Sequence, residues 1–128
     1  MSQTICVIED DESIQDVLRI VLNRAGYETA IYSYGRFIFE NSYALPDLFL
    51  IDKQLPGADG LTICSYLKNK RQTKDVPVIM MSAYPDVKQL SLLAGANDFI
   101  EKPFEVKTLV SIIQKHAPHE IAVKDFSH

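Results

Sequence analysis

The stretch from Asp47 to Asp52 constrains the fold more than any other part of the chain. Its four consecutive apolar residues, Leu48 to Ile51, are too few for an amphipathic helix. Such a run is typical of a strand covered on both faces, at the centre of a sheet. A Pro-Gly turn at 56–57 ends the strand soon afterwards, so we expect Asp52 at the strand's carboxyl end. A lone Asp there is usually only a strand end or a cap, so its role depends on the residues that join it.

Length and charge limit the classes of protein that the chain can belong to. With 128 residues it fits one domain that buries roughly two-thirds of its unfolded surface. The net charge is −4 and the longest basic cluster is 68–71, so we expect no direct nucleic-acid binding. The first residues lack the basic n-region and long apolar core of a secretory signal, and no apolar run approaches the ~20 residues of a membrane span. We therefore expect a cytoplasmic protein without membrane contact.

The cysteines and histidines give no sign of a metal or disulfide framework. Cys6 and Cys64 are far apart in the chain, one in an apolar run and one in a helical pattern, so we expect two buried free thiols. The histidines, His116, His119 and His128, lie at the C-terminal end. No Cys or carboxylate cluster joins them, so we expect them to be solvated or to cap a helix end.

Strand and helix patterns alternate along the whole chain. Apolar or alternating runs predict strands at 4–8, 27–32, 47–52, 76–81 and 97–100. Apolar residues at helical spacing and capping residues predict helices over 13–25, 34–41, 60–70, 86–94 and 105–116. Ser33 and Asp59 are the expected N-caps of the second and third helices, Asp11 or Glu12 that of the first, and Gly26 closes the first.

This alternation predicts an α/β fold: a doubly wound, five-stranded parallel sheet with helices on both faces. A doubly wound sheet is the commonest of these topologies for a chain of this length, and by analogy with known flavodoxin-like folds we predict the strand order 2-1-3-4-5. In such a sheet, the residues that follow strands one, three, four and five meet at one crevice. They are Glu9 and Asp10, Asp52, Ser82 and Lys102.

The chemistry of this set predicts a site for phosphoryl groups. Three neighbouring carboxylates repel one another unless a positive charge lies among them, and Mg²⁺ prefers a few carboxylate oxygens with water. Lys102 adds a mobile positive charge and Ser82 a hydroxyl donor, which suits an anion with several oxygens. Taken singly, each residue has an ordinary structural explanation. The residues occur together at the ends of strands that must be neighbours, and this favours a functional site.

Four stretches of the chain resemble the receiver domain of two-component response regulators, over nearly the whole length from Thr4 to about Ala117. They are Val7-Ile8-Glu9-Asp10-Asp11-Glu12, Leu50-Ile51-Asp52-Lys53-Gln54-Leu55-Pro56-Gly57-Ala58-Asp59-Gly60, Pro77-Val78-Ile79-Met80-Met81-Ser82-Ala83 and Gly95-Ala96-Asn97-Asp98-Phe99-Ile100-Glu101-Lys102-Pro103-Phe104. Their order and spacing are highly specific. The resemblance covers a domain at 1–118, with 119–128 a C-terminal tail or the start of a linker.

The resemblance implies a role for each site residue. Asp52 would be the phosphoacceptor, and Glu9, Asp10, Asp52 and the backbone carbonyl of Gln54 would hold Mg²⁺. Ser82 would be the switch hydroxyl, Phe99 the switch aromatic, and Lys102 the charge that grips the phosphoryl group. The family also implies a cis bond between Lys102 and Pro103.

The implied partners are a sensor histidine kinase or phosphotransfer protein, and a downstream output domain or protein. Asp52 would take the phosphoryl group from a phosphohistidine or a small acyl phosphate, so the protein would catalyse only its own phosphorylation and dephosphorylation. The change would switch the face formed by the fourth helix, fifth strand and last helix, with a phosphorylation-dependent homodimer as one outcome.

The chain departs from the commonest family pattern at two positions and has two residues that tune the site. Phe99 stands where Tyr is frequent, so it fills a pocket but carries no hydroxyl. Glu9 stands where Asp is more frequent. Gln54 and Tyr84, two residues after Asp52 and Ser82, flank the crevice and would control how water reaches the acyl phosphate. A bulky Tyr84 would slow hydrolysis, although an exposed loop aromatic without a role fits the sequence equally well.

Three other classes of protein share parts of this pattern. A haloacid-dehalogenase-like phosphatase needs a second Asp two residues after the nucleophile, where this chain has Gln54. A pseudo-receiver that only binds a partner has no need of the intact acidic set. A flavodoxin needs a Ser/Thr/Gly-rich phosphate loop after the first strand, where this chain has acids.

Overall fold

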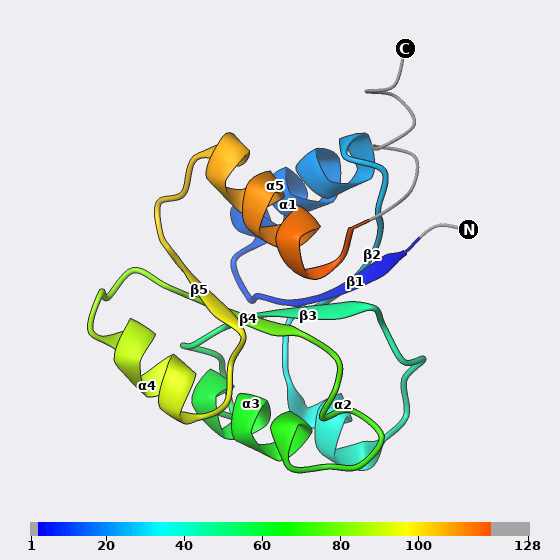
Figure 1. Cartoon of the computed structure of the whole chain (residues 1–128), viewed down its shortest axis with the longest axis vertical. Coiled ribbons are helices and arrows are strands. Elements are labelled where there is room, and N and C mark those ends of the chain that lie inside the picture. The colour runs from blue at the N-terminus through cyan, green and yellow to red at the C-terminus, as the bar shows by residue number, and fades with distance from the viewer. Residues whose placement is uncertain (1–2, 119–128) are drawn as a thin grey trace.

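The computed structural model describes residues 3–118, in which strands and helices alternate (Figure 1). The strands are β1 (Thr4–Ile8), β2 (Glu28–Tyr32), β3 (Leu48–Asp52), β4 (Val78–Ser82) and β5 (Asp98–Glu101). The helices are α1 (Glu12–Arg24), α2 (Arg36–Glu40), α3 (Gly60–Lys68), α4 (Val87–Leu93) and α5 (Val106–His116). The predicted element order is confirmed, with ends that shift by one or two residues in most cases.

The five strands form one parallel sheet in the order β2-β1-β3-β4-β5. This is the predicted doubly wound, flavodoxin-like topology. Helices α1 and α5 cover one face of the sheet, and α2, α3 and α4 cover the other (Figure 1). Because all strands run in the same direction, the loops after β1, β3, β4 and β5 emerge at one edge.

The central strand β3 is buried at every position, because it supplies both cores. Leu48 and Leu50 pack on the side of α1 and α5, while Phe49 and Ile51 pack on the side of α2, α3 and α4. Side chains alternate between the faces of a strand, so a strand with helices on both faces has no polar side. This explains the continuous apolar run of the sequence.

Several helix ends follow from local side-chain chemistry. The Asp11 carboxylate accepts hydrogen bonds from the backbone N–H groups of Ser13 and Ile14 and so caps α1. Gly26, which follows α1, has a φ of 97°, a conformation that favours glycine. The Asp59 carboxylate accepts from the Leu61 N–H and caps α3. These three predictions are confirmed.

The prediction for the start of α2 was wrong. The helix begins at Arg36, with Gly35 as its N-cap and no side-chain hydrogen bond at the cap. Ser33 lies too far before the helix to cap it. Its hydroxyl instead accepts a hydrogen bond of 3.0 Å from the Gln15 side chain of α1.

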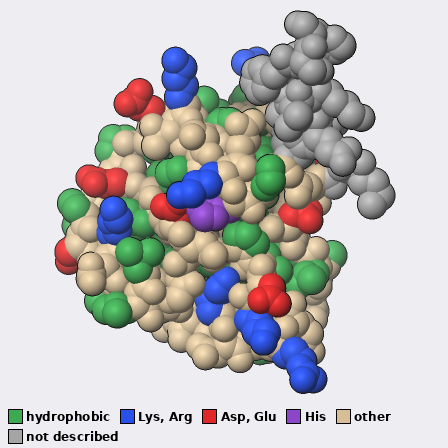
Figure 2. Space-filling view, viewed as in Figure 1, with side chains coloured by type: hydrophobic (Ala, Val, Ile, Leu, Met, Phe, Trp, Pro, Cys, Tyr) green, Lys and Arg blue, Asp and Glu red, His purple; other side chains and the backbone are tan. Residues whose placement is uncertain are grey.

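The expectation for the histidines was also wrong for His116. Its side chain is largely buried, and its Nε2 atom lies 2.9 Å from a carboxylate oxygen of Asp98 on β5. Lys115 approaches the same carboxylate at 3.9 Å. Figure 2 shows a histidine side chain on this face with basic and acidic side chains beside it. His119 and His128 lie outside the described residues.

Two further expectations can be compared with the structure. Cys6 and Cys64 are both free and buried, as predicted, and burial raises their pKa values to about 12 and about 11. Between residues 3 and 118, no helix has the length and apolar character that a membrane span requires.

Candidate functional site

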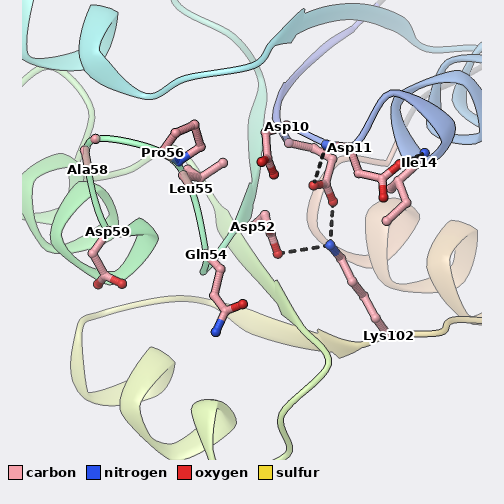
Figure 3. A pocket seen from close by; sticks show the side chains of 12 residues that line it. Asp10, Asp11, Ile14, Asp52, Gln54, Leu55, Pro56, Ala58, Asp59 and Lys102 are labelled. Carbon is pink, nitrogen blue, oxygen red and sulfur yellow. Dashed lines mark hydrogen bonds and ion pairs between the residues drawn. The ribbon is translucent and has the colours of Figure 1, made fainter.

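A cleft of about 770 Å³ opens at the carboxyl edge of the sheet (Figure 3). The residues that follow β1 and β3 form most of its wall, and Lys102 enters from the segment after β5. Among the predicted site residues, Glu9, Asp10, Asp52, Gln54 and Lys102 line it. The topology of the sheet therefore brings together residues that are far apart in the sequence.

Glu9 and Asp10 form the acidic start of the loop between β1 and α1. The Glu9 N–H donates to the Tyr32 carbonyl at 3.0 Å, which ties this loop to the end of β2. The Glu9 carboxylate accepts from the Asp11 N–H at 3.2 Å. Glu9 is 1% exposed, whereas Asp10 is exposed to solvent. The two neighbouring acids thus have different surroundings, one inside the cleft wall and one at its mouth.

Asp52 is held at the end of β3 by tight backbone packing. The next residue, Lys53, donates its N–H to Met81 on β4, and its carbonyl accepts from the Gly60 N–H. A Cβ atom at Gly60 would lie 2.2 Å from the Asp52 carbonyl oxygen, so only glycine permits this approach. Asp52 is 6% exposed. The backbone at Asp52 is therefore held in place, and its carboxylate lines the cleft.

Lys102 bridges the two buried acids. Its Nζ lies 2.5 Å from Glu9 Oε1 and 3.1 Å from Asp52 Oδ1, the two ion pairs drawn in Figure 3. The peptide bond from Lys102 to Pro103 is cis, as the family resemblance implies. The single ammonium group thus contacts both carboxylates at the bottom of the cleft.

The ionised forms of Glu9 and Asp52 remain unfavourable despite the neighbouring Lys102 cation. Burial raises the pKa of both Glu9 and Asp52, and a neighbouring carboxylate adds to the rise, Asp52 in the first case and Asp10 in the second. Lys102 offsets only part of this effect. Burial lowers the pKa of Lys102 itself, but hydrogen bonds to Glu9 and Asp52 outweigh burial and raise it. The ammonium group stays charged and the cleft retains surplus negative charge.

The donor set fits a hard divalent cation. Glu9, Asp10 and Asp52 each offer a carboxylate oxygen, and these oxygens lie within 4.8 Å of one another. Three carboxylates and one ammonium group leave a net charge of −2, which a divalent cation neutralises. Oxygen ligands from a few carboxylates, completed by water, suit Mg²⁺. Gln54 also lines the cleft, and its backbone carbonyl remains a predicted ligand.

The predicted switch and tuning residues lie beside the cleft. Ser82 is buried at the end of β4, and its Oγ accepts a hydrogen bond of 3.1 Å from the Tyr84 N–H. The Tyr84 side chain is 53% exposed. Phe99 on β5 is buried in the core on the side of α4. Of the described residues, the set that lines the cleft contains none of these three. Their roles remain predictions.

One contact of the acidic loop was not anticipated from the sequence. The Gln15 side-chain amide on α1 donates to the Glu9 carbonyl at 2.5 Å and to the Ser33 hydroxyl at 3.0 Å. In the sequence Gln15 is an ordinary polar position on an amphipathic helix, so no local signal marks it. Only the packing of α1 against two loops reveals it.

Comparison with known proteins identifies the family. The model of the response regulator receiver domain matches residues 5–114. The DNA-binding response regulator MtrA of Mycobacterium tuberculosis is 38% identical over 117 residues, which are 89% of this chain and 50% of MtrA. The phosphate regulon transcriptional regulatory protein PhoB of Escherichia coli is 33% identical, over 89% of this chain and 51% of PhoB. The chain thus spans about half the length of the curated relatives it matches.

Solved structures agree with this result. A response regulator structure from Chloroflexus aurantiacus superposes with a TM-score of 0.87 at 32% identity, covering 93% of this chain and all of that one. The receiver domain of the sensor histidine kinase PA1611 from Pseudomonas aeruginosa, which has a magnesium ion in its active-site cleft, gives 0.82 at 26% identity, with coverages of 93% and 100%. The chain therefore belongs to the receiver domain family of two-component response regulators.

Proposed function

We propose that this chain is a phosphoacceptor: Asp52 receives a phosphoryl group from the phosphohistidine of a sensor histidine kinase or phosphotransfer protein, in a reaction that depends on Mg²⁺. The observation that carries the proposal is the convergence of Glu9, Asp10, Asp52 and Lys102 in one cleft. Family membership supports it independently.

In the proposed reaction an Asp52 carboxylate oxygen attacks the phosphorus in line with the leaving group. An O–P bond to Asp52 forms while the N–P bond to the donor histidine breaks. The imidazole nitrogen keeps the electron pair of that bond. The rigid position of Asp52, set by the Lys53–Met81 and Lys53–Gly60 hydrogen bonds, aims the attacking oxygen into the cleft.

The surrounding charges suit this transfer. Glu9, Asp10, Asp52 and the Gln54 carbonyl would hold Mg²⁺, which when bound supplies positive charge to the oxygens of the transferring group. Lys102, which already lies 3.1 Å from Asp52, stabilises the same negative charge from the other side. Glu9 keeps Lys102 charged and in place through its ion pair.

Phosphorylation would then switch a surface of the domain. In the proposed switch, Ser82 leaves its contact with the Tyr84 N–H and donates its hydroxyl to a phosphoryl oxygen. Phe99 moves into the space that this opens, and the face of α4, β5 and α5 repacks. The position of Ser82 at the end of β4 and of Phe99 on the adjacent strand β5 supports this coupling. Phosphorylated Ser82→Ala protein should lose the spectral changes on that face, and retention of the parent's changes would overturn the switch.

The proposal also concerns partners and reaction class. The protein would catalyse only its own phosphorylation and dephosphorylation, and would signal to a downstream output domain or protein. The named relatives MtrA and PhoB are, respectively, a DNA-binding response regulator and a transcriptional regulator. By analogy, we propose that the output of this chain is coupled to a DNA-binding partner or domain, with a phosphorylation-dependent homodimer as the active form.

The test of phosphoacceptor function is a transfer assay with acetyl phosphate. The parent should acquire one stable acyl phosphate when Mg²⁺ is present and none in EDTA. Asp52→Asn should acquire none, because its amide is not a nucleophile. A protein that only binds partners gives no label, and a phosphatase releases phosphate continuously without accumulating label. Either of these results would refute the proposal.

A further inference from the structure

The Gln15 side chain connects three segments near the cleft. Gln15 lies on α1, with its side chain partly buried. Its amide nitrogen contacts the backbone carbonyl of Glu9 at 2.5 Å and the hydroxyl of Ser33 at 3.0 Å. A side-chain amide has two N–H donors, so each contact can use one of them. The residue thus links α1 to the acidic loop and to the segment between β2 and α2.

The contact to Glu9 completes the anchoring of the acidic loop. The Glu9 N–H is already held by the Tyr32 carbonyl, a bond between two backbones that does not depend on the side chain at either position. The Glu9 carbonyl, in contrast, is held by the side chain of Gln15. Any residue without a donor at position 15 would leave this carbonyl without that bond.

The anchored carbonyl belongs to the peptide unit that joins Glu9 to Asp10. This unit is planar, so a bond to its oxygen fixes the direction in which the chain enters Asp10. Within residues 3–118, no hydrogen bond or ion pair restrains the exposed Asp10 side chain. The backbone is therefore the main restraint on where the Asp10 carboxylate lies relative to Glu9 and Asp52.

We propose that Gln15 is a positioning residue for the metal site: its amide holds the Glu9–Asp10 peptide unit so that the acid pair is preorganised for a divalent cation. The inference rests on the proposed Mg²⁺ site but adds a residue outside the ligand set. Groups that orient ligands commonly change metal affinity by 10- to 100-fold when removed. Because Gln15 acts through the backbone, we expect an effect near the lower end.

A neutral amide suits this position better than a charged donor. Lys or Arg would also donate to the carbonyl, but would place a further positive charge beside a cation site. Glu has the shape of Gln but, when ionised, accepts hydrogen bonds only, so it cannot hold a carbonyl. The pair of variants Gln15→Glu and Gln15→Leu therefore removes the donor in two chemically different ways.

The experiment is a calorimetric titration of Mg²⁺ into the full chain, without a phosphodonor. Both Gln15→Leu and Gln15→Glu should raise the dissociation constant for Mg²⁺ about tenfold. Ser33→Ala, which removes only the second contact, should raise it less. Gln114→Leu on α5 is the matched control, because that side chain makes no hydrogen bond in the described structure, and it should leave Mg²⁺ binding unchanged.

Kinetics separate positioning from a general loss of stability. With acetyl phosphate, the Mg²⁺ concentration for half-maximal rate should rise in the Gln15 variants, while the rate at saturating Mg²⁺ stays within about twofold of the parent. Urea unfolding in EDTA reports any loss of stability separately. A parent-like dissociation constant in both Gln15 variants overturns this inference and leaves the phosphoacceptor proposal intact. A parent that binds no Mg²⁺ overturns both.

Discussion

Replacement of Lys102 by methionine probes the balance of charge in the cleft. The change keeps most of the side chain's volume but removes the cation that contacts Glu9 at 2.5 Å and Asp52 at 3.1 Å. Glu9 is 1% exposed, so little water reaches its carboxylate in place of the lost partner. A buried carboxylate without a partner destabilises the folded state until it takes up a proton.

The need for that proton sets the size of the effect. Protonating Glu9 costs about 1.4 kcal/mol for each pH unit above its ordinary pKa of 4.5, hence about 3.4 kcal/mol at pH 7. For Glu9 alone this is the upper limit, since protonation relieves any larger penalty. We expect Lys102→Met to lower the free energy of unfolding in EDTA by about 2–3.5 kcal/mol at pH 7.

The pH dependence has a definite sign. Without Lys102, the pKa of Glu9 in the folded state rises further above its unfolded value, so the folded state binds more protons. The loss of unfolding free energy in the variant is therefore largest at pH values above the pKa of Glu9 in the folded state. It disappears as the pH falls towards the pKa of Glu9 in the unfolded state. At pH 5 it should be about 0.7 kcal/mol. Excess Mg²⁺ at pH 7 should restore part of the stability, and should stabilise the variant more than the parent.

Urea unfolding followed by far-ultraviolet circular dichroism measures these differences, because the chain has no tryptophan for fluorescence. Lys53→Met is the matched control. Its ion pair with Asp59 is 3.3 Å long, and the two side chains are 28% and 41% exposed, so its loss should cost less than about 1 kcal/mol. A Lys102→Met deficit that is equal at pH 5 and pH 7, or no larger than that of Lys53→Met, would refute the reasoning.

Three further predictions concern neighbouring features. Gly60→Ala should destabilise the fold by about 2–4 kcal/mol in thermal or urea unfolding, since its Cβ would lie 2.2 Å from the Asp52 carbonyl oxygen; a loss below about 1 kcal/mol would contradict this. Mg²⁺ affinity measured by calorimetry should fall as the pH is lowered from 7 to 5, because burial raises the pKa of Glu9 and Asp52 and protons then compete with the metal; a flat profile would be inconsistent with these ligands. Tyr84→Ala should speed hydrolysis of the acyl phosphate several-fold in a decay assay if the exposed ring restricts access of water, and an unchanged half-life would assign the ring no such role.

Much of the fold could be predicted because its strands carry strong patterns. The apolar run in β3 implies helices on both faces, and the alternation of elements then leaves few topologies. Because the carboxyl ends of parallel strands lie at one edge of a sheet, the positions of Glu9, Asp52 and Lys102 after their strands predicted that these residues meet. Asp11 and Asp59 were predictable as caps because their side chains act on backbone only two or three residues away.

The errors arose where tertiary contacts decide the structure. Ser33 has the composition of an N-cap, but Gln15 binds its hydroxyl from a different helix. His116 was expected to be solvated or to cap a helix end, but the carboxylate of Asp98 on β5 lies within hydrogen-bond distance of its ring. Both partners are distant in sequence, 18 residues in each case, and a local pattern carries no information about them.

The most direct test of phosphoacceptor function locates the phosphoryl group itself. Protein treated with acetyl phosphate and Mg²⁺ can be reduced with borohydride, which converts an acyl-phosphorylated aspartate to homoserine, and then sequenced by mass spectrometry. We expect homoserine at position 52 alone, and none when Mg²⁺ is omitted. Modification at another acid such as Asp10, or none at Asp52 in the presence of Mg²⁺, would contradict it.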